Sequence, residues 1–337
     1  MLSKRTRVVG QWGLVAIFLS LLIYFGDFSD LFRLPTIRWP FIPLIFLSTI
    51  GFTLIHNLRW AAIVKEVSAG SQGGKSTFFQ LYRWLLDSYA LGTVVPGDVS
   101  LAGLRTFYMN RSQTLLLPKA LFSVLLDRFF DFIIFFLLAF PSALFMTKAA
   151  NDVEVLLILG CILAGILFSI FWRKGDALNW MMKVYSFGIG RLLKLPVIGR
   201  RMAMNNLDPS ANASFDERSA YLIMGWSFLK YFLLTLRFYF TGQALGVPFP
   251  LFQAIFFIPF IQVVGMLNVT PGGLGIVELG SYGALMLMGV PDSKIMLFVV
   301  GQRILLTLIT LSLPLMVRLI PFGSRLLIQL LPAKWEE

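Results

Sequence analysis

Long apolar runs separated by short polar stretches dominate the chain. Six of these runs are long enough, as α-helix, to cross a hydrocarbon core of roughly 30 Å. Their flanks are polar or basic, as expected where a helix leaves the bilayer. The pattern therefore predicts six membrane-spanning helices, over residues 8–25, 41–62, 116–145, 153–172, 220–246 and 295–320.

Two further apolar stretches, 78–95 and 251–269, each lead into a Pro-Gly pair that is followed by a second short segment. Lys and Arg are enriched in cytoplasmic loops, so the long basic loop 173–218 is expected inside. With the N-terminus also inside, each stretch must leave the membrane on the side where it entered. We therefore expect two inverted re-entrant helix pairs, 78–111 from the inner side and 251–289 from the outer side.

The distribution of Lys and Arg supports this topology. It puts 21 of the 29 Lys and Arg in inner segments and four in outer segments. A count in which either stretch crosses once would place a terminus or the basic loop outside. The predicted fold is an all-α polytopic membrane protein, with both termini on the cytoplasmic side of the inner membrane. One transmembrane domain, 1–321, would contain the basic amphipathic loop 173–218, and an interfacial tail, 322–337, would follow it.

The composition is that of a membrane protein and excludes several other classes of protein. Hydrophobic residues make up 57% of the chain and charged residues only 14%. A single cysteine and a single histidine exclude a disulfide framework, a Cys/His zinc cluster and a thioredoxin-like site. We interpret the net charge of +12 as topology rather than nucleic-acid binding, and we expect no cofactor. We expect His56 to be a satisfied interface side chain.

Ionisable residues inside spans cost roughly 3 kcal/mol each on insertion scales, so each needs a reason to be there. Asp127 and Asp131 lie one helical turn apart on one face, which must point into the bundle, with Arg128 about 100° around the helix. Lys230 and Arg237 share one stripe of their helix. Two interpretations stay open: these groups neutralise one another and fix helix rotation, or they line a substrate pathway.

The two Pro-Gly breaks predict a polar cavity. Interrupting a helix in lipid leaves backbone polar groups unpaired unless they face protein or a wet cavity. Glu278 and Arg105 each lie just beyond a break, where half-helix ends favour ions. We expect Glu278 to approach Arg105, Arg303 or Arg237 to ion-pair distance near the middle of the membrane.

Residues 270–278, Thr-Pro-Gly-Gly-Leu-Gly-Ile-Val-Glu, resemble the T-P-G-G-L-G-x-x-E signature of the lysylphosphatidylglycerol synthase transmembrane region, also called the flippase-like family. Other landmarks follow in the family's order and spacing, and the resemblance covers nearly the whole chain. It implies movement of a polar-headed lipid between leaflets, along a route lined by the two breaks. These landmarks are Leu58-Arg59-Trp60, Pro96-Gly97 with Arg105, Leu126-Asp127-Arg128 and Gln302-Arg303.

The chain departs from the family pattern at the first break. Ser100 replaces the usual second glycine, and residues 101–104 carry no acid ahead of Arg105, so Asp98 would supply the missing charge from another position. This departure affects the expected headgroup more than the fold. The soluble aminoacyl-transferase domain found in some family members is not expected here, so the chain should not synthesise aminoacyl-lipid by itself.

The main hypothesis is an inner-membrane flippase that moves a phospholipid, an aminoacyl-phospholipid or a lipid-linked glycan. No Walker A motif is present, so ATP is not expected to drive it. The expected partners are membrane lipids and a lipid-modifying enzyme, not nucleic acid. The alternative is a polytopic glycosyltransferase-like enzyme with Asp27 or Asp30 as base, and a third is a scaffold for lipid-modifying partners. The predicted pathway comprises Pro96, Gly97, Asp98, Arg105, Asp127, Arg128, Asp131, Lys230, Arg237, Pro271, Gly272, Gly273, Gly275, Glu278 and Arg303.

Overall fold

A computed structural model of the chain describes residues 4–27, 37–68, 76–95, 97–148, 154, 158, 217–247, 249–266 and 270–330. Regular structure within these residues is helical throughout, which confirms the predicted all-α class. The fourth predicted span and the basic loop lie outside the described residues, apart from two single positions in the span and residues 217–218, with which α10 begins. The helices are α1 (Lys4–Phe25), α3 (Phe41–Ser68), α4 (Phe78–Leu91), α5 (Gly97–Arg111), α6 (Leu117–Met146), α10 (Glu217–Ala244), α11 (Leu251–Met266), η1 (Pro271–Gly273), α12 (Ile276–Leu287) and α13 (Asp292–Leu330).

Helix length and composition are those of a membrane protein. In the described part of the chain, α3, α6 and residues Asp292–Leu319 of α13 are long and apolar enough to span a bilayer. Shorter apolar helical segments cover Val15–Tyr24 in α1 and Leu251–Met266 in α11. Helix α10 has 28 residues, enough to cross as well, but Lys230 and Arg237 interrupt its apolar character. Because charged side chains are costly in lipid, we expect Lys230 and Arg237 to face the interior of the bundle.

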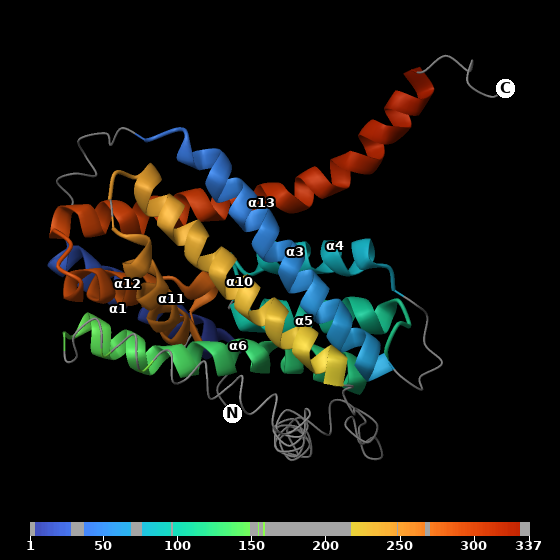
Figure 1. Cartoon of the computed structure of the whole chain (residues 1–337). Helices are drawn as coiled ribbons and strands as arrows, with labels where there is room; N and C mark the ends of the chain where they lie inside the picture. The colour runs from blue at the N-terminus through green and yellow to red at the C-terminus, as the bar shows by residue number, and fades with distance from the viewer. Residues whose placement is uncertain are drawn as a thin grey trace.

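The long helices run the length of the bundle, and the short helices occupy its two ends (Figure 1). Helix α3 packs along α10, antiparallel to it. Helices α4 and α5 lie at the end where α3 finishes and α6 begins, whereas α11 and α12 lie at the opposite end with the start of α13. The backbone of α13 continues as one helix through Leu330 and leaves the bundle, so the expected tail begins inside this helix.

Proline inside α11 is accommodated by a side chain from the neighbouring helix. Pro259 has no N–H, so the carbonyl of Ile255, four residues earlier, loses its helical donor. The hydroxyl of Tyr231, on α10, donates a hydrogen bond to that carbonyl instead. Because unpaired backbone groups are costly in an apolar interior, this bond both satisfies the carbonyl and joins α10 to α11.

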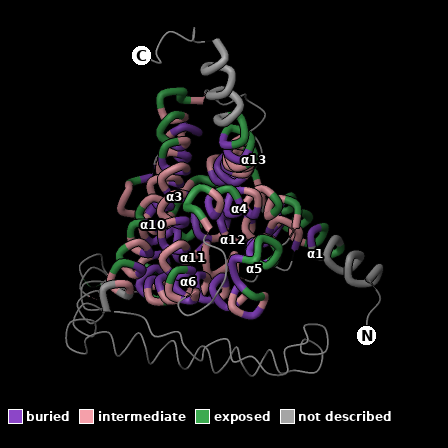
Figure 2. The backbone as a smooth tube through the Cα atoms, turned by 90° about the vertical axis from the view of Figure 1, so that its right-hand side faces the viewer, coloured by how far each residue is buried: buried purple, intermediate pink, exposed green. Residues whose placement is uncertain are grey.

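Buried residues occur in every labelled helix (Figure 2), and their apolar side chains form two main clusters. One cluster centres on Trp60, Leu85 and Phe122 and joins α3 to α4, α5 and the first half of α6. The other includes Phe257 and Phe298 and joins α10, α11, α12 and α13. Side chains from both clusters border a polar cavity, so the two halves of the core hold the site between them.

Candidate functional site

Asp127 is the centre of a buried group of charges contributed by three helices. Its Oδ1 accepts a hydrogen bond from Arg59 Nε at 2.9 Å, and its Oδ2 accepts from Arg105 Nη1 at 2.9 Å. His56 Nε2 lies 2.7 Å from the same Oδ2. When Nε2 donates to the carboxylate, His56 Nδ1 accepts from the Tyr89 hydroxyl at 2.5 Å. The carboxylate therefore has charged or polar partners on both oxygens and no exposed surface.

Asp131 extends this group one helical turn further along α6. Arg59 Nη1 donates to Oδ1 at 2.7 Å, so one arginine binds both aspartates. Lys230 Nζ, on α10, lies 2.9 Å from Oδ1 and 2.8 Å from Oδ2, and Arg128 Nη1 lies 3.5 Å from Oδ2. We call His56, Arg59, Arg105, Asp127, Asp131 and Lys230 the ion cluster.

The inward orientation predicted for the two aspartates is confirmed, since Asp127 is 0% and Asp131 is 6% exposed. Their main partners come from other helices, while the contact of Asp131 with Arg128, within α6, is longer. Arg59, which the sequence analysis named only as a family landmark, is wholly buried in α3, where two carboxylates offset the cost of burying its charge. His56 is satisfied as expected.

Arg105 does not approach Glu278, which was one of the arrangements expected. Its guanidinium lies over the Trp60 ring, 4.7 Å from the ring centroid, and its Nε donates to the Leu101 carbonyl at 2.8 Å. Together with the bond to Asp127, these contacts hold Arg105 inside the ion cluster. The adjacent acid of α6 satisfies the charge that we expected to face the second break.

At the second break, Glu278 and Arg303 bind the backbone groups that the interruption frees. Glu278 Oε2 accepts a hydrogen bond from the Gly275 N–H at 2.7 Å, and its Oε1 lies 3.3 Å from Arg303 Nη1. Arg303 Nη2 in turn donates to the Gly272 carbonyl at 2.5 Å. Of the partners expected for Glu278, the structure therefore places Arg303 at ion-pair distance. The pair supplies polar partners that an unbroken helix would not need.

The two Pro-Gly regions touch each other. The Gly272 N–H donates to the Val95 carbonyl at 3.4 Å, which joins the second break to the end of the first. Gly272 has a φ of 59°, and a Cβ there would overlap the Thr93 carbonyl oxygen. Only glycine fits this close approach of two backbones without strain. The contact brings together segments far apart in the sequence at the same point inside the bundle.

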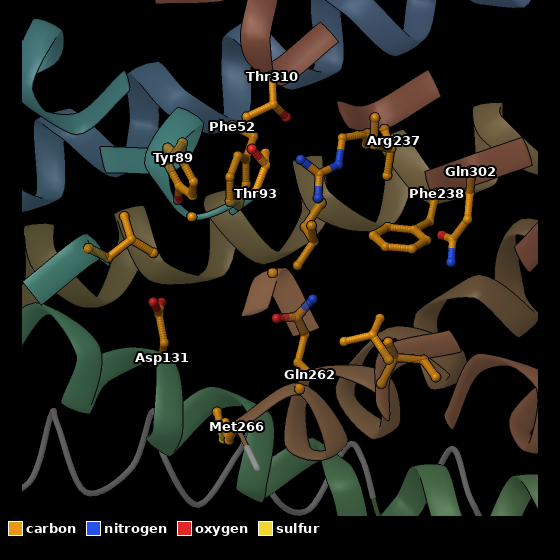
Figure 3. Close-up of a pocket in the computed structure, with 18 of the residues that line it drawn as sticks. Phe52, Tyr89, Thr93, Asp131, Arg237, Phe238, Gln262, Met266, Gln302 and Thr310 are labelled. Carbon is orange, nitrogen blue, oxygen red and sulfur yellow. The ribbon is translucent and has the colours of Figure 1, made fainter. Parts of the chain in front are cut away.

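A cavity of about 330 Å³ lies beside this contact (Figure 3). Its walls combine aromatic rings, among them Phe52 and Phe238, with polar and charged side chains. Figure 3 shows Arg237 reaching into it, with Gln262 on the facing wall. The polar lining residues are Tyr89, Thr93, Arg128, Asp131, Lys230, Arg237, Gln262, Glu278, Gln302, Arg303, Thr307 and Thr310.

The predicted pathway residues separate into four groups. Arg128, Asp131, Lys230, Arg237, Gly272, Glu278 and Arg303 line the cavity. Arg105 and Asp127 are fully buried in the ion cluster, and Pro271, Gly273 and Gly275 shape the second break. Gly97 opens α5, whereas Pro96 and the side chain of Asp98 lie outside the described residues.

Sequence reasoning missed three residues at the site. Arg59 was visible only as a family landmark, although it lies three positions after His56 and so on the same helix face. Tyr89 and Gln262 are single polar groups in apolar stretches, a weak signal for the cavity that both line. Among the described residues, no group of three or more His, Cys, Asp and Glu could hold a metal ion.

Comparison with known families adds an identification. The family model described as the lysylphosphatidylglycerol synthase TM region matches residues 8–313. The chain belongs to this family. The part that matches the lysylphosphatidylglycerol synthase TM region includes both breaks, the ion cluster and every residue that lines the cavity. Among curated proteins and among solved structures, no match to the chain was found.

Proposed function

We propose that the protein is a lipid flippase that moves a polar-headed lipid between the leaflets through the cavity at the two breaks. The observation that carries this proposal is a polar, charged cavity inside an apolar helical bundle, at the point where two interrupted helices meet. Membership of the lysylphosphatidylglycerol synthase TM region family supports an association with lipid. A volume of about 330 Å³ falls in the range of small-molecule sites, which suits a headgroup rather than a whole lipid.

The proposed topology has six spans and two re-entrant pairs, α4 with α5 from the inner side and α11 with α12 from the outer side. The arrangement of the ends supports it, because α1, α6 and α10 finish at the end of the bundle where α13 begins. The excess of Lys and Arg in the segments predicted inside supports an inner-membrane protein with cytoplasmic termini. Opposed broken helices around a central site are typical of transporters.

The cavity wall would act by replacing water around the headgroup. Transfer of an unpaired polar group into hydrocarbon costs several kcal/mol, and a charge costs far more. Arg303, Lys230 and Glu278 line the cavity and offer charged hydrogen-bond partners, so a headgroup would exchange one partner for the next while the acyl chains stay in the bilayer. A lipid gradient, consumption by a partner enzyme or ion coupling would then set the direction.

Reconstitution tests this proposal. Purified protein in proteoliposomes should accelerate the movement of a labelled phospholipid, an aminoacylated phospholipid or a lipid-linked glycan over protein-free vesicles. A heat-inactivated sample controls for leak. Failure to accelerate any member of these three classes would overturn the proposal.

A transferase with Asp27 as base remains the alternative, and substitutions separate the two. Asp27 is exposed just after the end of α1 and is not one of the residues that line the cavity, and Asp30 lies outside the described residues. The flippase proposal predicts that Glu278→Gln slows lipid movement while Asp27→Asn leaves it unchanged. The transferase alternative predicts the reverse for turnover of a lipid-linked donor.

A further inference from the structure

Arg237 differs from the other cations of the site because no carboxylate among the described residues forms an ion pair with it. Its guanidinium carbon lies 4.9 Å from the centroid of the Phe52 ring and 5.4 Å from that of Phe238. These two rings hold the side chain in place through cation–π contacts. Its Nε is buried and has no hydrogen-bond partner in the described structure. The ring contacts position the guanidinium but do not neutralise it.

The described walls of the cavity carry more positive than negative charge. Four lining residues are cationic, namely Arg128, Lys230, Arg237 and Arg303, and two are acidic, namely Asp131 and Glu278. Both carboxylates are already engaged, Asp131 by Arg59 and Lys230 and Glu278 by Arg303 and the Gly275 N–H. A buried cation without a counter-ion is costly, so the excess charge favours an anionic occupant.

Neutral polar groups next to Arg237 indicate which hydrogen-bonding groups the bound ligand carries besides its anionic group. Figure 3 shows the Gln262 amide across the cavity from the Arg237 guanidinium, with Thr93 and Thr310 nearby. The side chain of Gln302 is buried, and its Oε1 lacks a hydrogen-bond partner in the described structure. An amide oxygen accepts hydrogen bonds, so it suits a hydroxyl donor.

We propose that this cavity binds a lipid with an anionic phosphodiester and an uncharged, hydroxylated headgroup, and that it discriminates against aminoacylated lipids. Arg237 would hold the phosphate, since a guanidinium matches two phosphate oxygens at once. The amides of Gln262 and Gln302 would bind headgroup hydroxyls. An aminoacyl ester adds an ammonium group, which the excess positive charge of the wall would repel. This inference rests on the proposed flippase function and names its substrate.

Lipid selectivity in proteoliposomes tests the inference. The probes are labelled phosphatidylglycerol, phosphatidylcholine and lysyl-phosphatidylglycerol, which share the phosphodiester and differ in headgroup charge. Phosphatidylglycerol should move fastest and lysyl-phosphatidylglycerol slowest, with a difference of about tenfold or more between them. Movement of lysyl-phosphatidylglycerol at an equal or higher rate would overturn the inference and leave the flippase function standing.

Substitution of Arg237 tests the assigned phosphate contact. Arg237→Gln should slow phosphatidylglycerol movement about tenfold and reduce the preference over phosphatidylcholine, whereas Arg237→Lys should fall between it and the parent because a lysine cannot bind two oxygens at once. The matched control is Arg111→Gln, which removes an exposed arginine outside the cavity and should change nothing. Folding is checked by size-exclusion chromatography. Normal rate and selectivity in Arg237→Gln would overturn the assignment.

A binding measurement separates failure of this inference from failure of the function. If no lipid moves in vesicles, the flippase proposal is lost, but titration of the detergent-solubilised protein still tests the site. Short-chain phosphatidylglycerol should bind at least about tenfold more tightly than glycerol phosphate or inorganic phosphate, and Arg237→Gln should abolish the difference. Equal binding of inorganic phosphate would overturn the lipid assignment, and absence of binding by all three would overturn the anion site.

Discussion

The ion cluster and the cavity wall beside it contain the same kinds of side chain, but they differ in how completely their charges are paired and in how deeply they are buried. Around Asp127 and Asp131, four helices provide acids, bases and a histidine that pair with one another, and none of these side chains is more than 8% exposed. On the cavity wall, the guanidinium of Arg237 lies against two aromatic rings and forms no ion pair with a described carboxylate, and the Arg303 side chain that pairs with Glu278 is 29% exposed. The charges of the ion cluster bind mainly one another, and only Asp131 and Lys230 among them also line the cavity, whereas Arg237 has no carboxylate partner among the described residues and is available to a ligand.

This difference assigns a structural role to the ion cluster and a binding role to the cavity wall. The ion cluster draws α3, α5, α6 and α10 together, and its cost of burial is offset only while every partner is present. The wall can change partners because one side of each group faces open space. The comparison predicts that substitutions in the cluster change mainly stability and that substitutions on the wall change mainly transport.

Asp127→Asn should have the largest effect on stability. It leaves Arg59 and Arg105 without one of their counter-ions in the interior, which should reduce the free energy of unfolding by about 3–5 kcal/mol. Thermal unfolding in detergent, followed by intrinsic fluorescence, measures it. The control is Ser227→Ala, which removes an uncharged hydroxyl that accepts a hydrogen bond from Arg59 and should cost less, about 1.5–3 kcal/mol. An Asp127→Asn variant with the unfolding temperature of the parent but no transport would place Asp127 in the lipid pathway. It would contradict the proposed difference between the ion cluster and the cavity wall.

Gly272→Ala should be the next most harmful substitution. The added Cβ meets the Thr93 carbonyl oxygen at a φ of 59°, so either the backbone is strained or the two breaks move apart, at a cost of about 1–3 kcal/mol. Unfolding temperature and lipid movement are measured together, and both should fall. Gly103→Ala is the matched control, because a Cβ there meets nothing and alanine favours a helix. Equal effects at both glycines would argue against contact between the breaks.

Glu278→Gln should leave stability almost unchanged and affect transport. Glutamine can still accept from the Gly275 N–H, while the loss of the partly exposed pair with Arg303 should cost about 1 kcal/mol or less. Lipid movement in proteoliposomes should slow roughly tenfold, because a charge-assisted hydrogen bond is lost from the wall. Glu278→Asp keeps the charge and should slow it less. Normal transport in Glu278→Gln would remove Glu278 from the pathway.

Arg318→Gln should have the smallest effect. Arg318 pairs with Asp87 at 2.6 Å, but its side chain is 53% exposed, and solvated pairs contribute about 0.2–1 kcal/mol. Unfolding temperature and transport should both stay within error of the parent, at low and at high salt. A marked loss of transport would show that the α4 and α13 surface takes part, contrary to the division proposed above.

The second break could be predicted in some detail from the sequence. Glu278 stands three positions after Gly275, so once the Pro-Gly pair interrupts the helix, spacing alone brings its carboxylate to the freed N–H. Arg303 could be named only as one of several partners. Arg105 shows the limit, since the same reasoning applied to the first break placed it beside Glu278, whereas α6 presents an acid closer to it.

Arg59 shows why the ion cluster was harder to predict than its two aspartates. The one-turn spacing of Asp127 and Asp131 is local, so their shared inward face follows from helix geometry. Arg59 lies near the predicted end of a span, a position equally typical of a loop arginine that faces the cytoplasm. Only the packing of α3 against α6 and α10 decides between the two environments.

The sequence by itself determined the all-α class, the family and the positions of the two breaks. It could do so because helix formation in lipid is a local requirement: each backbone group must be satisfied within its own segment, so long apolar runs and their Pro-Gly interruptions are directly visible. The tertiary structure decided which charges meet. Asp127 binds an arginine 68 positions away, and Gly272 meets Val95 from another break. Such pairings depend on helix rotation and depth, which many distant apolar contacts set together and which no short stretch of sequence records.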